Sequence, residues 1–327
     1  MDLLVIGGTV FVGRAVVAEA RKRGHTVTIF HRGEHGEDAF PDVEHVHGDR
    51  KTDLARLDGR TWDAVVDTCG FDGGTVGASA RHLSARVGHY GFVSSVSVYS
   101  DWPAVAVDET AAVKPMGHED SYGAGKVAAE AAAEAAMPGR VLVSRPGLIA
   151  GPYENIGRLP YWLRRVALGG EVLAPGDPDE PRQWIDARDL AAFHLDCAEQ
   201  GTTGVFNTVG PPAQFTMREL LDTCREVTGG DATFTWVDGA TITGAGLQPW
   251  TEIPIWLWDA DGDVSQSWNV DVSKARAAGL AVRPLRETVE DTWAWVQAGA
   301  DLGGYRSQYA VPDPDPEKER AALQAAR

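Results

Sequence analysis

A short apolar strand that runs directly into a glycine turn is the feature that most restricts the fold of this chain. Residues 3–6 are all apolar, as expected of a strand buried on both faces, and a helical pattern follows the turn as far as Arg23. Glycines let a backbone turn tightly and approach a pyrophosphate, which then lies against the free N–H groups at the helix start. A glycine turn that binds no nucleotide remains the alternative. The predicted phosphate cradle consists of Gly7, Gly8, Thr9, Val10, Phe11, Val12 and Gly13.

Three further segments predict strands whose carboxyl ends would meet the same ligand. Residues 25–32, 43–47 and 64–67 have strand patterns. In a parallel sheet, ligands gather outside the carboxyl ends of the strands. We therefore expect an α/β fold, a Rossmann-type doubly wound parallel sheet, with residues 1–150 as the dinucleotide-binding domain. The strand-end residues assigned to the cofactor are His31, Arg32, Asp49, Arg50, Thr68 and Cys69.

Arg32 bears on which dinucleotide binds. An acidic residue at this strand end would hydrogen-bond the ribose 2′-hydroxyl of NAD, whereas an arginine can pair with the 2′-phosphate of NADP. We predict a preference for NADP over NAD, and a solvated Arg32 in a turn is the alternative. His45 and His47 share one face of the third strand, but no cysteine or carboxylate cluster accompanies them. We interpret them as structural or surface histidines and predict no metal.

A tyrosine and a lysine four residues apart form the candidate proton-transfer pair. Residues 120–134 are rich in alanine and glutamate, which are strong helix formers, so Tyr122 and Lys126 should lie on one helical face. The cation favours the phenolate and lowers the pKa of Tyr122 toward the range in which a phenol exchanges a proton near neutral pH. The alternative is a surface tyrosine beside a surface lysine. Upstream, the strand pattern at residues 90–95 ends in hydroxyls that could hold a substrate oxygen.

Beyond residue 150 the pattern loosens into a second region. We predict that residues 151–310 mainly bind the substrate, that residues 182–209 return to the first domain, and that residues 311–327 form an exposed helical or disordered tail. Five tryptophans crowd residues 233–270. They indicate either an aromatic pocket wall or the core of a small domain.

The charge of the chain excludes whole classes of partner. A formal net charge of −17 repels phosphate backbones and anionic lipid surfaces, so we expect neither nucleic acid nor membrane as a partner. An anionic ligand must then be held by a local site. There is no signal-peptide pattern and no apolar run long enough to cross a bilayer, and the three cysteines are widely spaced. These features predict a cytoplasmic protein with reduced thiols.

Together, these motifs resemble the extended short-chain dehydrogenase/reductase family, which includes NAD-dependent sugar epimerases and dehydratases. The resemblance covers the chain to about residue 300. Its carriers are, in order, the glycine turn, residues 92–99, Tyr122 with Lys126, and residues 145–152, 182–191 and 271–285. Six matches in the right order are far more specific than any one of them.

The resemblance implies a role for individual residues. Tyr122 would be the general acid/base, Lys126 would lower its pKa and hold the nicotinamide ribose, and Ser95 would orient the substrate oxygen. Ser97 and Ser94 are the fallback for that last role. Pro146 would abut the nicotinamide, and Arg182 matches a position that often holds an anionic part of the substrate. A small-molecule substrate and a homodimer formed through paired helices are also implied.

Two departures from the family pattern narrow the function. Val10 stands where the family has its middle glycine, which resembles an atypical branch that includes catalytically silent RNA-binding relatives; the retained Tyr122 and Lys126 favour a working enzyme. Val96 and Ser97 stand where sugar 4,6-dehydratases of the family carry Asp-Glu, which disfavours elimination of water. The leading hypothesis is an NAD(P)-dependent oxidoreductase acting on a carbonyl or hydroxyl carbon. The alternatives are an NAD-dependent sugar epimerase and a non-catalytic binding protein on the same fold.

Overall fold

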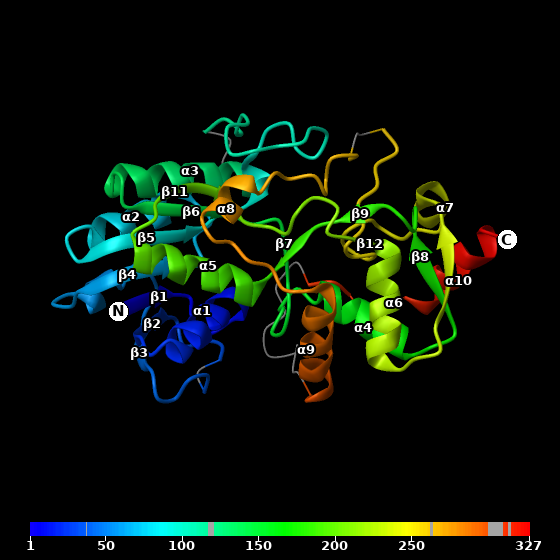
Figure 1. Cartoon of the computed structure of the whole chain (residues 1–327), viewed down its shortest axis with the longest axis horizontal. Helices are drawn as coiled ribbons and strands as arrows, with labels where there is room; N and C mark the ends of the chain where they lie inside the picture. The colour runs from blue at the N-terminus through cyan, green and yellow to red at the C-terminus, as the bar shows by residue number, and fades with distance from the viewer. Residues whose placement is uncertain (37, 117–120, 262–263, 300–309, 313–314) are drawn as a thin grey trace.

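A seven-stranded parallel sheet organises the amino-terminal half of the molecule (Figure 1). The computed structural model describes residues 1–36, 38–116, 121–261, 264–299, 310–312 and 315–327. The strand order is β11-β6-β5-β4-β1-β2-β3, so the chain winds outward in one direction from β1 and then in the other from β4. The Rossmann-type doubly wound fold is thereby confirmed, with its topological switch between β1 and β4. The strands are β1 (Asp2–Ile6), β2 (Thr26–His31), β3 (Glu44–His47), β4 (Trp62–Asp67), β5 (Val87–Val93), β6 (Val141–Arg145) and β11 (Gly204–Asn207).

Helices cover both faces of this sheet. On one face lie α1 (Phe11–Lys22) and α5 (Ala187–Gln200), which pack against each other, and on the other lie α2 (Gly73–Leu83) and α3 (Tyr122–Ala136). Two short 3₁₀ helices, η1 (Leu54–Leu57) and η2 (Val96–Val98), follow β3 and β5. Each face has its own apolar core, and the side chains of Leu3 and Val5 alternate with those of Leu4 and Ile6 between the two. Burial on both faces explains why the first strand is apolar without alternation.

A second lobe is built around short strand pairs and a tryptophan-rich core. The strand pairs are β7 (Leu148–Ala150) with β10 (Trp184–Asp186), β8 (Glu171–Pro175) with β13 (Thr233–Val237), and β9 (Pro181–Arg182) with β12 (Phe215–Thr216). Trp256 and Trp268 are buried in this core, so both belong to the packed interior and not to an open wall. The helices are α4 (Arg158–Ala167), α6 (Met217–Thr228), α7 (Gly239–Gly244), α8 (Ser273–Ala277), α9 (Leu285–Gln297) and α10 (Pro316–Ala325).

The two lobes are not consecutive in the chain. After β7 to β10 the chain returns to the first sheet through α5 and β11, which lie inside the predicted returning segment 182–209, and then leaves again for α6. The predicted second region runs to residue 310, and residues 262–263 and 300–309 of it lie outside the described residues. No helix in the described ranges is both long and apolar enough to cross a lipid bilayer.

The carboxyl-terminal helix corrects one expectation. The helix of the first alternative is present, but it is not a free tail: α10 packs on the second core, where Ala322 and Leu323 are buried. Glu319 accepts from the Arg165 Nε atom at 2.8 Å, and the Lys318 ammonium donates to Glu252 at 2.6 Å. The charged composition of this segment concealed an apolar face of only two residues, which is too short to register as a periodic pattern.

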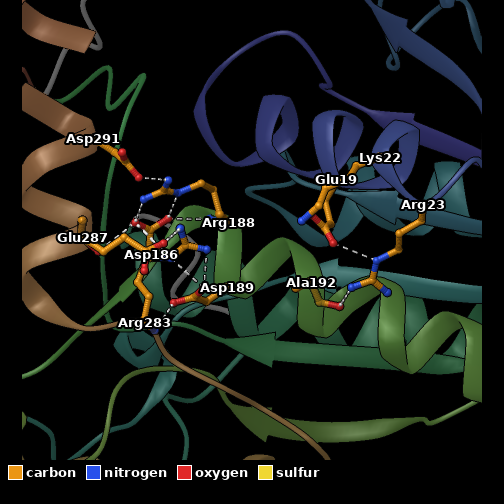
Figure 2. A network of polar contacts seen from close by, with 11 residues as sticks. Glu19, Lys22, Arg23, Asp186, Arg188, Asp189, Ala192, Arg283, Glu287 and Asp291 are labelled. Carbon is orange, nitrogen blue, oxygen red and sulfur yellow. Dashed lines mark hydrogen bonds and ion pairs between the residues drawn. The ribbon is translucent and has the colours of Figure 1, made fainter. Parts of the chain in front are cut away.

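An ion-pair network joins α5 to elements of both lobes (Figure 2). Asp186, the N-cap of α5, accepts from the Arg188 side chain at 2.8 Å and from the Thr288 hydroxyl of α9 at 2.9 Å. Asp189, in the first turn of α5, accepts from the Arg283 guanidinium at 2.7 Å. Toward the other end of α5, Arg23 beyond α1 donates to Asp196 at 2.6 Å. The separated segments 182–191 and 271–285 thus contact each other through Arg283 and Asp189.

Candidate active site

The glycine turn after β1 has the geometry of a phosphate cradle. Gly7 has a φ of +88°, in the region that favours glycine, and a Cβ atom on Gly13 would lie 2.0 Å from the Gly7 carbonyl oxygen. Val10 is the N-cap of α1 in an extended conformation with φ −124° and ψ 139°, which any residue adopts. No described side chain caps this helix start. The N–H groups of the first turn can therefore receive an anion. The strain in this turn falls on the residue after Val10, because Phe11 has a φ of +39°.

The carboxyl end of β4 packs against this turn. The Thr68 hydroxyl donates to the Ile6 carbonyl oxygen at 3.0 Å, and a Cβ atom on Gly7 would lie 2.9 Å from the Cys69 sulfur. Burial, followed by the charge of Asp67, raises the pKa of the Cys69 thiol, so the sulfur is a neutral packing group. Thr68 and Cys69 thus lie beside the cradle, as the parallel-sheet argument predicts.

The guanidinium of Arg50 is committed elsewhere, which corrects its assignment to the cofactor. It donates to both carboxylate oxygens of Asp67, at 2.7 and 2.6 Å, and to the Ser79 hydroxyl at 2.9 Å. The Tyr90 hydroxyl also donates to Asp67, at 2.7 Å, and all these groups are buried. Although burial opposes ionisation, Arg50 holds the pKa of Asp67 below its usual range. The sequence could not reveal this pair because Arg50 lies in the turn after β3, whereas Asp67 ends β4.

Three residues predicted to contact the cofactor lie where β2 and β3 finish. The His31 ring is buried and contacts His45 and His47 at centroid distances of 5.0 and 4.8 Å. Burial, followed by these two neighbours, lowers the pKa of His31 to about 4. Arg32 forms an exposed ion pair of 2.9 Å with Glu34. The Asp49 carboxylate accepts from the backbone N–H of Lys51 at 2.8 Å and so shapes the turn after β3.

Tyr122 and Lys126 lie in the first turns of α3, as predicted. Ser121 caps this helix by accepting from the Ala124 N–H. The Lys126 ammonium lies 5.8 Å from the centre of the Tyr122 ring and donates to the Val93 carbonyl oxygen at 2.8 Å. Lys126 is 2% exposed whereas Tyr122 is 51% exposed. Burial lowers the pKa of Lys126 to about 8, although Asp67, Cys69 and Glu130 oppose this shift.

The start of α3 packs directly on η2, which brings the tyrosine beside the serine loop. A Cβ atom on Gly123 would lie 2.1 Å from the Ser97 carbonyl oxygen, and one on Gly125 would lie 2.4 Å from the Phe71 carbonyl oxygen. The Phe71 ring is 59% exposed and lies 6.3 Å from the Tyr122 ring. The two glycines of α3 therefore permit a close approach that places Tyr122 between η2 and the loop after β4.

The three serines differ in what their hydroxyls do. Ser94 donates to Glu130 at 2.5 Å and is buried, which excludes it as the fallback for orienting a substrate. Ser95 is the N-cap of η2, and its hydroxyl donates to the Ser97 hydroxyl at 3.1 Å. The Val96 N–H donates to the Pro146 carbonyl oxygen at 3.0 Å. Ser95, Ser97 and Pro146 are thus held together at the carboxyl edge of β5 and β6.

Arg182 is not positioned to bind an anion, which corrects its substrate-binding assignment. Its side chain is 0% exposed and donates to the Ile255 carbonyl oxygen at 2.9 Å, to the Pro181 carbonyl oxygen at 2.9 Å and to Glu180 at 3.0 Å. Its guanidinium carbon lies 5.1 Å from the Trp268 ring centre. The residue holds the second core together through Ile255, and this is the one of the three acceptors that is distant in the sequence.

One cation that the sequence argument overlooked lies beside the cradle. The guanidinium carbon of Arg14 is 4.1 Å from the Tyr153 ring centre and 5.2 Å from that of Phe40. Tyr153 and Phe40 both have positive φ, at 67° and 59°, and the Tyr153 ring also packs, tilted by 47°, against Trp295 of α9. Within the described residues, these two rings are the partners of the Arg14 side chain. In the sequence, the position of Arg14 directly after Gly13 could have indicated a cation near the phosphate cradle.

Comparisons with known proteins agree with this architecture. Residues 75–208 match the model of the NAD dependent epimerase/dehydratase family. A UDP-glucose 4-epimerase of Corynebacterium glutamicum is 28% identical over 280 residues, which covers 70% of this chain and 81% of that protein.

Solved structures of similar shape are also epimerases by name. A UDP-N-acetylglucosamine 4-epimerase from Methanobrevibacter ruminantium has a TM-score of 0.71 at 17% identity and covers 91% of this chain and 98% of its own. A UDP-glucuronic acid 4-epimerase from Bacillus cereus, solved in complex with NAD, has a TM-score of 0.66 at 16% identity and covers 92% of this chain and 100% of its own. At such identities these structures establish the shared fold.

Proposed function

Because residues 75–208 belong to the NAD-dependent epimerase/dehydratase family, we propose that this protein is an NAD-dependent epimerase of a sugar or sugar nucleotide. The single observation that carries the proposal is the Tyr122–Lys126 pair, set against the Ser95 loop at the carboxyl edge of the parallel sheet. This proposal replaces the leading hypothesis from the sequence, a net oxidoreductase, with the first alternative, an NAD-dependent sugar epimerase. The similarity to the UDP-glucose 4-epimerase of Corynebacterium glutamicum supports an isomerase, which would transfer the hydride twice in each turnover.

The cradle fits a dinucleotide. An uncapped helix start, a glycine turn at positive φ and a flanking guanidinium favour a pyrophosphate locally, even in a chain of net charge −17. The turn would bind the pyrophosphate through Thr9 to Gly13, and Arg14 would supply the nearby positive charge. When bound, NAD would accept a hydride from a carbinol carbon and later return it to the opposite face of that carbon.

The protein's own residues would manage the proton. Tyr122 takes the proton from the substrate hydroxyl as the carbon is oxidised, and returns it when the carbonyl is reduced. Lys126 favours the phenolate, and its remaining N–H groups can hold the nicotinamide ribose. Ser95 donates to the same substrate oxygen and keeps it within reach of the phenol. Tyr122 is 51% exposed, so a substrate can approach this side chain from the solvent.

The stack of Arg14 on Tyr153 supports retention of the cofactor. Tyr153 belongs to the segment after β7, whereas Arg14 is in the first turns of α1, so their contact joins the second lobe to the edge of the cradle. An epimerase regenerates its NAD in every turnover and gains from slow release. A dehydrogenase must exchange its cofactor each time.

A reductase that prefers NADP is the second candidate, and Arg32 is the observation that favours it. Its ion pair with Glu34 is exposed on both sides and is worth at most about 1 kcal/mol, so a 2′-phosphate can recruit the guanidinium. On this alternative the protein would consume NADPH. We propose NAD as the cofactor because the epimerase chemistry has no need of a reducing pool.

Two measurements separate these functions. The protein is purified without added cofactor, and any dinucleotide released on denaturation is identified by mass. It is then incubated with UDP-glucose or UDP-N-acetylglucosamine without a reductant, and the products are resolved by chromatography. Epimerised product and retained NAD support the proposal, with Tyr122→Phe as an inactive control that still retains NAD. Net NADPH consumption with a carbonyl substrate, without epimerisation, would refute it.

A further inference from the structure

Three histidines meet where β2 and β3 end. His31 and His47 are directly opposite each other in the parallel register, and His45 is two residues before His47. Alternate residues of a strand point to the same face, so all three imidazoles lie on one side of these two strands. One nitrogen from each ring can be chosen such that all three atoms lie within 4.8 Å of one another. The sequence showed only the His45–His47 pair, and the fold adds His31.

The hydrogen bonds within the cluster determine which nitrogen atoms face each other. His31 Nε2 and His45 Nδ1 are 2.8 Å apart, so one proton is shared between two nitrogen lone pairs. The other nitrogen of His45, Nε2, donates to the Phe40 carbonyl oxygen at 3.2 Å, which assigns Nδ1 as its acceptor. A backbone carbonyl that orients an imidazole in this way is a common second partner of metal-bound histidines.

We propose that His31, His45 and His47 bind a divalent transition-metal ion, and that Zn²⁺ suits this site best. Three neutral imidazoles with a fourth position open to water form a known zinc ligand set, and borderline-soft ions such as Zn²⁺ prefer nitrogen ligands to oxygen. His31 is buried, His45 is half-buried and His47 is exposed, so the ion would enter from the solvent side. The net charge of −17 favours the additional two positive charges.

Metal binding rearranges one proton and a few atoms. Because zinc–nitrogen bonds are about 2.0–2.1 Å and tetrahedral, the two facing nitrogens must separate from 2.8 Å to roughly 3.4 Å. The proton on His31 Nε2 moves to Nδ1, and the hydrogen bond that Nδ1 accepts from the Gly33 N–H at 3.2 Å is lost. No oxidant or further reactant is required. The ion would then tie β3, the edge strand of the sheet, to β2.

The site lies at the adenosine end of the cradle, so metal and dinucleotide should influence each other. Any effect of the ion on NAD affinity must equal the effect of NAD on metal affinity, because binding free energies are reciprocal. The metal site itself does not depend on the proposed epimerase activity. Its test can therefore be performed on the whole protein without a turnover assay.

The test is calorimetric titration of the untagged, chelator-treated protein with ZnCl₂, repeated with CoCl₂ to record the visible absorption of the bound Co²⁺. We expect one ion per chain with micromolar or tighter affinity, a tetrahedral Co²⁺ spectrum, and a zinc-dependent rise in Tm. His47→Ala and His45→Ala should each weaken binding by tenfold or more. His82→Ala, on α2, is the matched control and should bind as the wild type does.

Two results would overturn the assignment. Absence of stoichiometric binding at tens of micromolar Zn²⁺ would show that the cluster is only a hydrogen-bonded group. Binding that is unchanged in both His45→Ala and His47→Ala would place the ion elsewhere. Since His47 is exposed, its replacement should not unfold the protein, and a melting curve without metal verifies this for each variant.

Discussion

The buried ammonium of Lys126 should lower the free energy of unfolding, so replacing Lys126 with an apolar residue should stabilise the protein. Burial lowers the pKa of this lysine from 10.5 to about 8, and at 1.36 kcal/mol for each pKa unit this corresponds to about 3 kcal/mol against folding at pH 7. Lys126→Met keeps the length and removes the charge. It also removes the hydrogen bond to the Val93 carbonyl oxygen, worth about 1 kcal/mol. The variant should therefore be more stable than the wild type by about 2 kcal/mol at pH 7.

The pH dependence of stability provides the sharper assay. Between the folded pKa of about 8 and the unfolded value of 10.5, the unfolded chain holds a proton that the folded chain has released. The free energy of unfolding of the wild type consequently gains a rising contribution with pH in this window, and Lys126→Met should lack it. Other groups that titrate there are common to both proteins, so the difference between the two curves isolates the lysine.

The measurement is urea unfolding of the cofactor-free protein at pH 7, 8, 9 and 10, with Lys22→Met as the exposed control. Lys22 projects from α1 with 79% of its side chain exposed, so its replacement should change stability by less than about 0.5 kcal/mol. A Lys126→Met protein that is less stable at pH 7, or that keeps the wild-type pH dependence, would refute the reasoning. Catalysis should be lost in the same variant. Lys126 would then be a residue that is kept for activity although it lowers the stability of the fold.

Three further predictions concern other parts of the structure. Asp67→Asn leaves the buried Arg50 charge without its partner and should cost about 3–5 kcal/mol by denaturant titration; a loss under 1 kcal/mol would contradict the pairing. Ser95→Ala should lower kcat roughly 100-fold, whereas Ser94→Ala should lower Tm and leave kcat within severalfold, and the reverse order would exchange their roles. Deletion of residues 315–327 should lower Tm by more than about 5 °C because it uncovers the second core; an unchanged Tm would show that α10 is dispensable.

Local patterns predicted the first lobe well because its causes are local. The apolar strand, the glycine turn and the capped helix around Tyr122 each depend on neighbours within a few residues. Arg50 and Arg182 were misassigned because burial and a partner far along the chain decide whether a guanidinium is available. The position of an arginine at the end of a strand predicts where its backbone lies, but it does not predict which group its guanidinium binds.

The same limit explains what was overlooked. His31 gave no indication of His47 as a neighbour until the strand register placed the two opposite each other. The contact between Arg14 and Tyr153 could not be predicted from local sequence, because the two residues belong to different lobes and meet only when both lobes are assembled. The docking of α10 depends on ion pairs to residues that precede it by more than sixty positions.

The attachment of α5 to both lobes has a consequence for engineering substrate scope. Asp186 and Asp189 are held by Arg188, Arg283 and Thr288, yet α5 itself lies on the seven-stranded sheet. A chimera that imports a foreign second lobe as one contiguous cassette would separate Asp189 from Arg283 and Asp186 from Thr288, and would leave Asp189 without its guanidinium partner. Recombination should instead exchange two inserts, before and after the α5–β11 return, and retain the charged residues at both seams.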